Sequence, residues 1–118
     1  KLLLDGAHSD TSAKNLYNHL RATKLPIYFI WGMLKNKNPN KFLKNFKGIF
    51  KKIVTITIPN QSNACSESFL KGLALKQGYD TVTSKNVADA LKQISSDEKK
   101  LVCVSGSLYL IGSTLKIN

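Results

Sequence analysis

Residues 27–31 read Ile27-Tyr28-Phe29-Ile30-Trp31, and Gly32-Met33-Leu34-Lys35 follows them directly. Similar apolar runs lie at residues 2–4, 53–58 and 101–104, and a weaker one lies near residues 80–83. Short, nearly continuous apolar strands are expected where both faces of a sheet are covered. The sequence therefore predicts a sheet that is buried on both sides.

Segments with the apolar spacing of helices lie between these runs. Ala13, Leu16, Tyr17 and Leu20 follow the i, i+3, i+4, i+7 pattern. Further apolar stripes fall within residues 42–50, 69–74, 87–94 and 108–115. The alternation predicts an α/β fold, a three-layer, doubly wound, mostly parallel sheet with right-handed crossovers. Because no internal repeat or linker interrupts it, we expect residues 1–118 to form a single domain.

The net charge of +11 raises the question of an anionic partner. Of the 18 basic residues only Arg21 is an arginine, and ten asparagines accompany the lysines. A surface that binds phosphates or base edges usually favours the arginine fork. We therefore interpret the charge as a lysine-rich solvated surface. A basic field that attracts anionic substrates stays open as the alternative.

The two cysteines, Cys65 and Cys103, match no metal or redox spacing and predict reduced, buried thiols in a cytoplasmic protein. No apolar run approaches the roughly 20 residues of a membrane span, and no signal peptide is present, so we expect no membrane contact. The chain lacks an initiating Met and opens on an apolar run. We expect it to be a domain of a longer protein, with part of the machinery upstream.

Candidate functional residues follow the predicted strands. These residues are Asp5-Gly6-Ala7-His8, Gly32-Met33-Leu34-Lys35, Pro59-Asn60 and Ser105-Gly106-Ser107. In an open parallel sheet, ligands bind at the carboxyl ends of the strands. We therefore expect the four segments to meet at one edge, and a binding site to lie there.

Asp5 and His8 form the most suggestive pair. Gly6 permits a tight turn that would bring the carboxylate and the imidazole to the same edge. Asp5 can accept hydrogen bonds from ribose hydroxyls or an ammonium group, and His8 can donate to a phosphoryl or carboxylate oxygen. The structural alternative is that Asp5 closes a turn and His8 precedes a helix cap at one of residues 9–11.

Gly106 and Ser107 stand at the start of the last predicted helix. Backbone N–H groups and the helix dipole there suit a carboxylate or a phosphate, although an ordinary Ser N-cap is the alternative. The chain contains neither G-x-G-x-x-G nor G-x-x-x-x-G-K-[ST], so any ATP phosphates must be held mainly elsewhere. We assign no catalytic residue and no metal ligand within the chain.

The four segments resemble motifs of the C-terminal domain of folylpolyglutamate/dihydrofolate synthases, which belong to the Mur ligase superfamily. Residues 5–8 are similar to D-G-A-H-N, residues 32–38 to G-M-L-K-D-K-D, and residues 105–112 to S-G-S-L-Y-L-V-G. Ile58-Pro59-Asn60 lies where that family has a similar turn. The motifs occur in order with matching spacing and span nearly the whole chain.

The resemblance implies a Rossmann-like Mur ligase C-terminal domain of an ATP-dependent ligase. In that family a central ATPase domain, absent here, carries the phosphate loop and holds Mg²⁺. ATP phosphorylates the carboxylate of folate or dihydropteroate, and L-glutamate then attacks the acyl phosphate. Carried over by position, Asp5 and His8 would line the ATP/glutamate side of the cleft, Gly106 and Ser107 would help bind glutamate, and the domain would close the cleft.

Four positions depart from the family pattern. Ser9 replaces an Asn, Asn36 and Asn38 replace two acids, and Asn63 lies near the place of a usual Arg. These changes leave the details of substrate binding open. The sequence also does not decide between dihydrofolate synthesis and polyglutamate extension.

The resemblance further implies a monomeric parent enzyme of folate and one-carbon metabolism. We expect the isolated domain to be inactive, because half of the site is missing. Two other functions stay open. One is a basic α/β module that binds RNA, which the lone arginine and the missing basic–aromatic interleaving weigh against. The other is a Mur-type ligase that acts on a peptidoglycan precursor.

Overall fold

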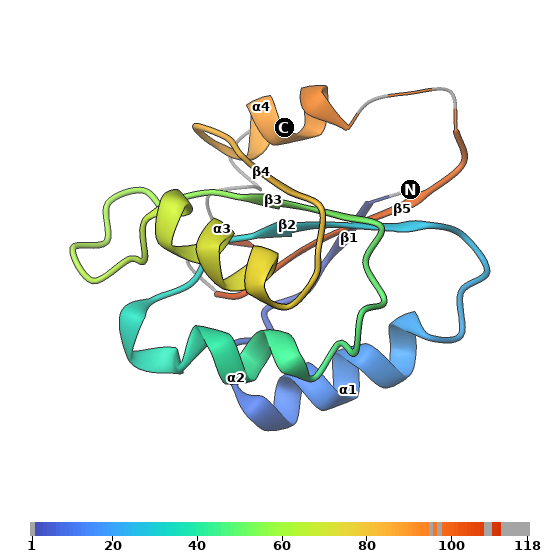
Figure 1. Cartoon of the computed structure of the whole chain (residues 1–118), viewed down its shortest axis with the longest axis horizontal. Coiled ribbons are helices and arrows are strands. Elements are labelled where there is room, and N and C mark those ends of the chain that lie inside the picture. The colour runs from blue at the N-terminus through green and yellow to red at the C-terminus, as the bar shows by residue number, and fades with distance from the viewer. Residues whose placement is uncertain (1, 95, 97, 108–109, 112–118) are drawn as a thin grey trace.

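The computed structural model describes residues 2–94, 96, 98–107, 110 and 111. Its centre is a five-stranded sheet with the strand order β1-β5-β2-β3-β4 (Figure 1). The strands are β1 (Leu2–Leu4), β2 (Ile27–Trp31), β3 (Lys52–Thr55), β4 (Thr81–Thr83) and β5 (Leu101–Ser105). All four neighbouring pairs are parallel, which confirms the predicted parallel sheet. The weaker strand expected near residues 80–83 is β4, and it lies at one edge of the sheet.

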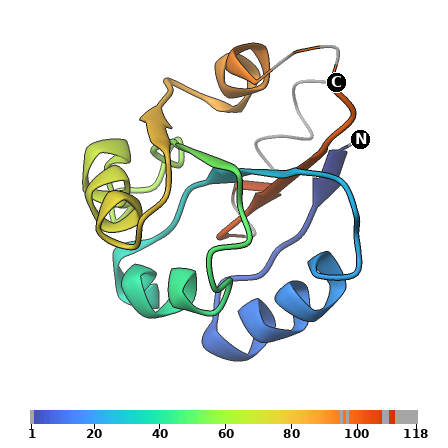
Figure 2. The same cartoon turned by 45° about the vertical axis from the view of Figure 1, so that its right-hand side comes forward.

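Helices cover both faces of the sheet, as Figure 2 shows from a second direction. The helices are α1 (Asp10–Leu20), the 3-10 helix η1 (Lys35–Lys37), α2 (Pro39–Lys44), α3 (Glu67–Lys76) and α4 (Val87–Gln93). Leu16 of α1, Phe42 of α2 and Leu70 of α3 share one buried cluster, while Val87 and Ala90 of α4 belong to a second cluster. The described part of the chain is therefore a three-layer, doubly wound α/β fold, as predicted.

The central strand β2 explains why the sheet is covered on both sides. Phe29 and Trp31 belong to the cluster under α1, α2 and α3, whereas Ile30 belongs to the cluster under α4. Side chains alternate between the faces of a strand, so an unbroken apolar run requires an apolar partner layer on each face. Phe29 stacks on Phe50 with ring centroids 4.2 Å apart, which anchors the segment before β3.

Two predicted boundaries differ from the structure. The helix expected to reach residue 50 ends at Lys44, and Lys47 and Gly48 take positive φ angles of 50° and 77° that a right-handed helix does not allow. Phe46 and Phe50 keep their core positions without helical structure. The strand expected over residues 53–58 ends at Thr55, although Ile56 still donates its N–H to the Trp31 carbonyl at 3.0 Å.

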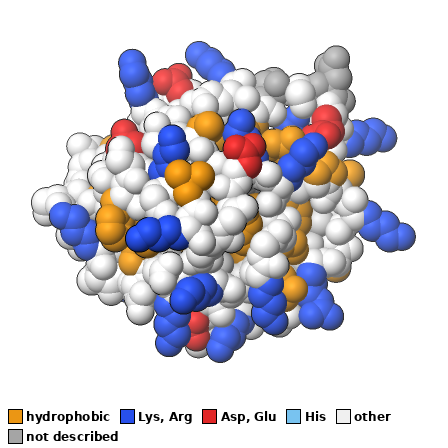
Figure 3. Space-filling model, in the orientation of Figure 1, with side chains coloured by type: hydrophobic (Ala, Val, Ile, Leu, Met, Phe, Trp, Pro, Cys, Tyr) orange, Lys and Arg blue, Asp and Glu red, His pale blue; other side chains and the backbone are white. Residues whose placement is uncertain are grey.

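Three other expectations concern the surface and the C-terminal segment. None of the helices in the described ranges is long and apolar enough to span a bilayer. Lys and Arg side chains are spread over the face seen in Figure 3 and do not gather in one field there. The final helix predicted within residues 108–115 lies mostly outside the described residues, of which only Leu110 and Ile111 fall in that range.

Candidate functional site at the carboxyl edge of the sheet

The loop after β1 and the loop after β5 are joined at the carboxyl edge. Asp5 donates its N–H to the Val104 carbonyl at 3.1 Å, which prolongs the pairing of β1 with β5. Gly106 donates its N–H to the Ala7 carbonyl at 3.0 Å, and the Ser105 hydroxyl donates to the same carbonyl at 3.3 Å. The structure therefore brings the Asp5–His8 and Gly106–Ser107 segments together, as the sequence predicted.

Gly106 also ties this edge to the end of β2. A Cβ atom at Gly106 would lie 2.0 Å from the Gly32 carbonyl oxygen, and the residue has a φ of 121°. Both the contact and the backbone angle require glycine. The carboxyl ends of β1, β5 and β2 are thus in van der Waals contact through one residue without a side chain.

Within the first loop, Asp5 and His8 each use one side-chain polar atom in a hydrogen bond to the local backbone. Asp5 Oδ1 accepts the Ala7 N–H at 2.8 Å, and His8 Nδ1 lies 2.8 Å from the Gly6 carbonyl oxygen. A carbonyl only accepts, so His8 Nδ1 carries the proton and Nε2 is left for a ligand. Asp5 Oδ2 has no hydrogen-bond partner among the described residues, so the turn role and a binding role are compatible.

The start of α1 fixes the orientation of His8. Ser9 is the N-cap: its hydroxyl accepts the Ser12 N–H at 3.2 Å, and the Ser12 hydroxyl accepts the Ser9 N–H at 2.9 Å. The same Ser12 hydroxyl accepts the His8 N–H at 3.0 Å. The helix cap predicted at residues 9–11 is therefore Ser9, and this departure from the family pattern has a structural role.

Ser107 lies at the edge but is only 3% exposed. Its carbonyl accepts the Ile111 N–H at 3.2 Å. The Gly106 N–H is already donated to the Ala7 carbonyl, so a ligand at this segment would have to bind at Ser107 instead.

The loop after β2 is completed by a distant segment that sequence reasoning did not assign to the site. Leu34 and Ala64 form an antiparallel bridge, Lys35 donates its N–H to the Asn63 carbonyl at 2.8 Å, and Cys65 donates to the Met33 carbonyl at 2.8 Å. Asn63 therefore contributes to this edge through its backbone carbonyl, which accepts the Lys35 N–H.

A hollow of about 440 Å³ opens beside this bridge. Its lining is mostly apolar and includes Lys35, Thr57, Cys65 and Phe69. Phe69 was predicted to lie in the core stripe of its helix, and this is wrong, because its side chain is 54% exposed. Phe69 lies in α3 next to the buried Leu70. Its place in the apolar stripe did not reveal that its side chain faces away from the sheet.

The electrostatics of this edge reflect burial and short hydrogen bonds. The Thr57 hydroxyl donates to Glu67 Oε1 and lowers the pKa of Glu67 below 4.5. Burial raises the pKa of Cys65, and burial together with the charge of Asp5 raises the pKa of Cys103 to about 12. Both thiols are therefore protonated at neutral pH and unsuited to nucleophilic chemistry. Within the described ranges, no group of three His, Cys, Asp or Glu residues could hold a metal.

The fold and this edge define the class of the protein, a doubly wound α/β domain with its candidate site at the carboxyl ends of neighbouring parallel strands. The chain belongs to the family of dihydrofolate synthetase C-terminal domains, whose family sequence model matches residues 1–117. It is 26% identical over 129 residues to the dihydrofolate synthetase of Saccharomyces cerevisiae, covering 99% of this chain and 30% of that protein.

Solved structures share the fold. The folylpolyglutamate synthase of Mycobacterium tuberculosis, complexed with ADP and AMPPCP, matches with a TM-score of 0.86 and 17% identity over 98% of this chain and 29% of that one. A bifunctional folylpolyglutamate synthase/dihydrofolate synthase with Mn, AMPPNP and L-glutamate bound matches with a TM-score of 0.81 and 20% identity over 98% of this chain and 28% of that one. The chain thus spans less than a third of the length of these relatives.

Proposed function

We propose that the protein carrying this chain is an ATP-dependent ligase that joins L-glutamate to the carboxyl group of dihydropteroate or folate. The observation that supports this most is the junction of the Asp5–His8 and Gly106–Ser107 segments through the Gly106 N–H and the Ala7 carbonyl. Membership of the dihydrofolate synthetase C-terminal domain family favours the folate branch over a peptidoglycan precursor.

In the proposed reaction, an oxygen of the substrate carboxylate attacks the γ-phosphorus of ATP, and ADP leaves. The amino group of glutamate then attacks the carbonyl carbon of the acyl phosphate. Inorganic phosphate leaves as the C–N bond forms, and the nitrogen loses a proton. An acyl phosphate hydrolyses readily, so a domain that closes over it and excludes water protects the intermediate. We assign this closure to the present domain.

The rest of the protein would hold the triphosphate and its metal ion. The chain contains no phosphate-loop motif, and its described part offers no metal-binding group. The ADP and AMPPCP named for the Mycobacterium structure, and the Mn, AMPPNP and L-glutamate named for the bifunctional synthase, support the same ligand classes here. Mg²⁺ is the divalent ion that we propose for this protein.

The proposed roles of His8 and Asp5 follow from polar atoms that the local structure leaves available, whereas those of Gly106 and Ser107 follow from their position at the edge. His8 Nε2 would donate to a phosphoryl or carboxylate oxygen when the ring is protonated, while Nδ1 stays on the Gly6 carbonyl. Asp5 Oδ2 would accept from a ribose hydroxyl or the glutamate ammonium group. Gly106 would shape the loop, and Ser107 would contact glutamate.

Glutamate incorporation by the full-length protein tests these roles. We expect Asp5→Ala, His8→Ala and Ser107→Ala each to lower kcat/KM by roughly 10- to 100-fold, the loss of one to two good hydrogen bonds to charged groups. His19→Ala is the matched control, because His19 is exposed on α1 and should leave the rate unchanged. Thermal unfolding of each variant separates a lost contact from a lost fold. Near-normal kinetics in all three variants would refute the site.

The isolated chain offers a second test. Because the nucleotide phosphates and the metal ion would be held outside it, we expect no glutamate incorporation by residues 1–118 alone, and full activity only in the longer protein. Turnover by the isolated chain at the rate of the full-length protein would contradict the proposed division of roles.

A further inference from the structure

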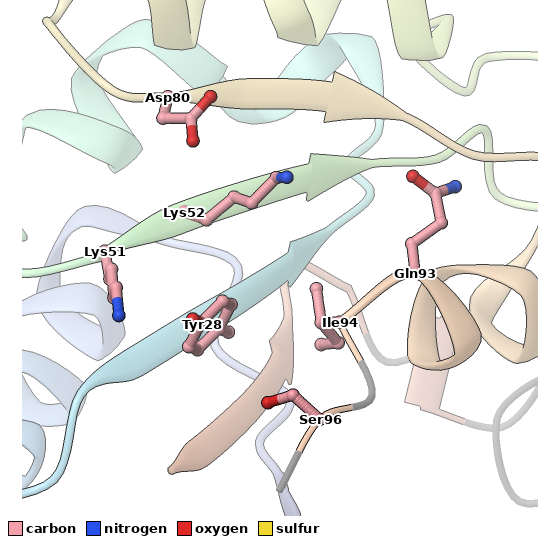
Figure 4. A pocket seen from close by; sticks show the side chains of 7 residues that line it. All are labelled: Tyr28, Lys51, Lys52, Asp80, Gln93, Ile94 and Ser96. Atoms are coloured by element: carbon pink, nitrogen blue, oxygen red, sulfur yellow. The ribbon is translucent and has the colours of Figure 1, made fainter. Parts of the chain in front are cut away.

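The amino edge of the sheet, opposite the candidate site, carries two adjoining hollows that share Lys51. The first measures about 300 Å³ and is shown in Figure 4, where Lys52 of β3 and Asp80, the residue before β4, lie above Tyr28. Its charges are balanced. Lys51 Nζ lies 2.9 Å from Glu98 Oε2, the Tyr28 hydroxyl donates to Glu98 Oε1 at 2.9 Å, and Asp80 lies beside Lys52. This hollow has no marked preference for an anion.

The second hollow is different. It measures about 430 Å³ and lies between the end of α1, the loop before β2 and the turn before β3. Arg21, Lys47 and Lys51 line it, and no carboxylate does. Clustered cations without an acid repel one another, and an anion that bridges them relieves this repulsion.

Among the described residues, two of the three cations of this hollow have no carboxylate partner, and the third has an exposed one. Within the described ranges, neither Arg21 nor Lys47 forms a salt bridge, and the pair of Lys51 with Glu98 is exposed to solvent at both side chains. Arg21 is the single arginine of the chain, and its planar fork suits two oxygens of a phosphate. No local sequence pattern predicts that it lines one hollow with lysines that lie 26 and 30 positions further along.

The turn that carries Lys47 is held in place by buried groups. Gly48 donates its N–H to the Tyr79 hydroxyl at 2.8 Å, and Lys51 donates its N–H to the Ile27 carbonyl at 2.8 Å. Phe50 packs on Phe29 beneath the turn. Lys47 Nζ lies 5.2 Å from the centre of the Tyr17 ring, so an aromatic face also borders the hollow. A ligand would therefore meet a site that is ordered before it binds.

We propose that this hollow, defined by Arg21, Lys47 and Lys51, binds a small ligand with two or more adjacent phosphoryl groups. Arg21 and Lys47, joined by Lys51 when its exposed pair with Glu98 opens, match the charge density of an oligophosphate in a hollow of about 430 Å³ better than that of a monocarboxylate. The ligand can be a free oligophosphate or the phosphate tail of a nucleotide. The site lies at the edge opposite Asp5 and His8, and its argument does not depend on the proposed ligase function.

Calorimetric titration of the full-length protein with tripolyphosphate tests the proposal. The protein carries Asp5→Ala and His8→Ala, and the phosphate site that we propose in the rest of the protein is fitted as a separate class of sites, so that only the amino-edge class is compared. At about 150 mM salt, where charges beyond roughly 8 Å are screened, we expect the added pair Arg21→Gln and Lys47→Gln to weaken binding at least tenfold. Arg21→Lys should recover only part of the loss, because it restores charge without the fork.

The matched control is the pair Lys44→Gln and Lys76→Gln. Both lysines are exposed and line neither hollow of the amino edge, so this pair removes equal charge elsewhere. We expect a change of less than about twofold. Equal loss in the control pair would show a general field and overturn the proposal, as would unchanged affinity in the Arg21→Gln, Lys47→Gln pair.

Two further ligands identify the source of the phosphates. Tighter binding of ATP than of tripolyphosphate, lost in the Arg21→Gln, Lys47→Gln pair, supports a nucleotide, whereas equal binding supports a free oligophosphate. Binding of single-stranded RNA without any binding of tripolyphosphate would overturn the proposal in favour of a polymer surface. Failure of the ligase function would appear separately, as unaltered glutamate incorporation in the Asp5→Ala and His8→Ala proteins.

Discussion

The two edges of the sheet are built by different kinds of contact. At the carboxyl edge, short residues bond to the backbone of neighbouring loops: Gly106 reaches Ala7, and Asp5 closes its own turn. At the amino edge, long charged side chains such as Lys51 and Glu98 meet in solvent. Backbone contacts between short residues fix positions closely, whereas exposed ion pairs add little stability.

This difference indicates where substitutions should matter most. Gly106 cannot take a side chain without moving a strand end, so this part of the carboxyl edge is both ordered and fragile. The lysines of the amino edge can be exchanged for neutral residues with little effect on the fold. Charge variants there should alter ligand binding alone, which makes the two edges separable by experiment.

The largest expected effect comes from Gly106→Ala. The new methyl group would lie 2.0 Å from the Gly32 carbonyl oxygen, and the φ of 121° is one that alanine rarely adopts. We expect a loss of roughly 3 kcal/mol or more in the free energy of unfolding, from strain and overpacking together. Urea unfolding followed by circular dichroism measures it.

Gly72→Ala is the control for Gly106→Ala. Gly72 lies inside α3, and nothing approaches within 4 Å of a Cβ atom placed there. Alanine should therefore stabilise the helix by about 0.5–1 kcal/mol. Equal stability of the two variants would contradict the tight junction of the strand ends.

A smaller effect is expected for Ser9→Ala, which also tests the carboxyl edge. The Ser9 hydroxyl accepts the Ser12 N–H at 3.2 Å, and its loss leaves this end of α1 uncapped. We expect a cost of about 1 kcal/mol in unfolding free energy. Ser9→Asn would restore a capping side chain and should recover most of the stability. No difference between the alanine and asparagine variants would show that the cap does not hold the loop.

The sequence predicted the carboxyl edge because parallel strands place their ends together. Asp5, His8, Gly106 and Ser107 could be placed at one edge from strand positions alone, and their co-location is confirmed. Their binding roles stay predictions. The shared edge could be predicted from strand direction, whereas the hydrogen bond that joins Gly106 to Ala7 could be seen only in the structure.

Features that depend on long-range pairing could not be predicted. The hollow with Thr57 and Phe69 exists because residues 33–35 pair with residues 63–65, and no local pattern encodes that pairing. The end of α2 was missed because Phe46 and Phe50 remain in the core after the helix stops. Arg21 and Lys47 line one hollow only because α1 and the turn before β3 lie side by side in the fold.

A still smaller effect is expected for Thr57→Val. The Thr57 hydroxyl donates to Glu67 Oε1 and accepts the Glu67 N–H at 3.0 Å, and the first bond lowers the pKa of this carboxyl. Because the carboxylate is partly exposed, we expect a loss of about 0.5 kcal/mol at pH 7.

The pH dependence of this variant follows from the direction of the pKa shift. A lowered pKa stabilises the fold at pH values above 4.5, the ordinary pKa of the group, and this contribution is lost as the pH falls through the lowered value. The stability difference between the Thr57→Val variant and the original protein should therefore shrink between pH 7 and about pH 3. A difference that grows on acidification would contradict the bond.

The smallest effect on stability is expected at the amino edge, for Lys51→Gln. The hydrogen bond from Lys51 lowers the pKa of Glu98, and both side chains are exposed. NMR titration should show the pKa of Glu98 rising toward 4.5 in the variant, while the urea midpoint stays unchanged. Lys76→Gln, in which the exchanged lysine lies at the end of α3, should move neither quantity. A clear drop in the midpoint for Lys51→Gln alone would mean that the amino edge also helps to hold the fold, and the separation of the two edges would then fail.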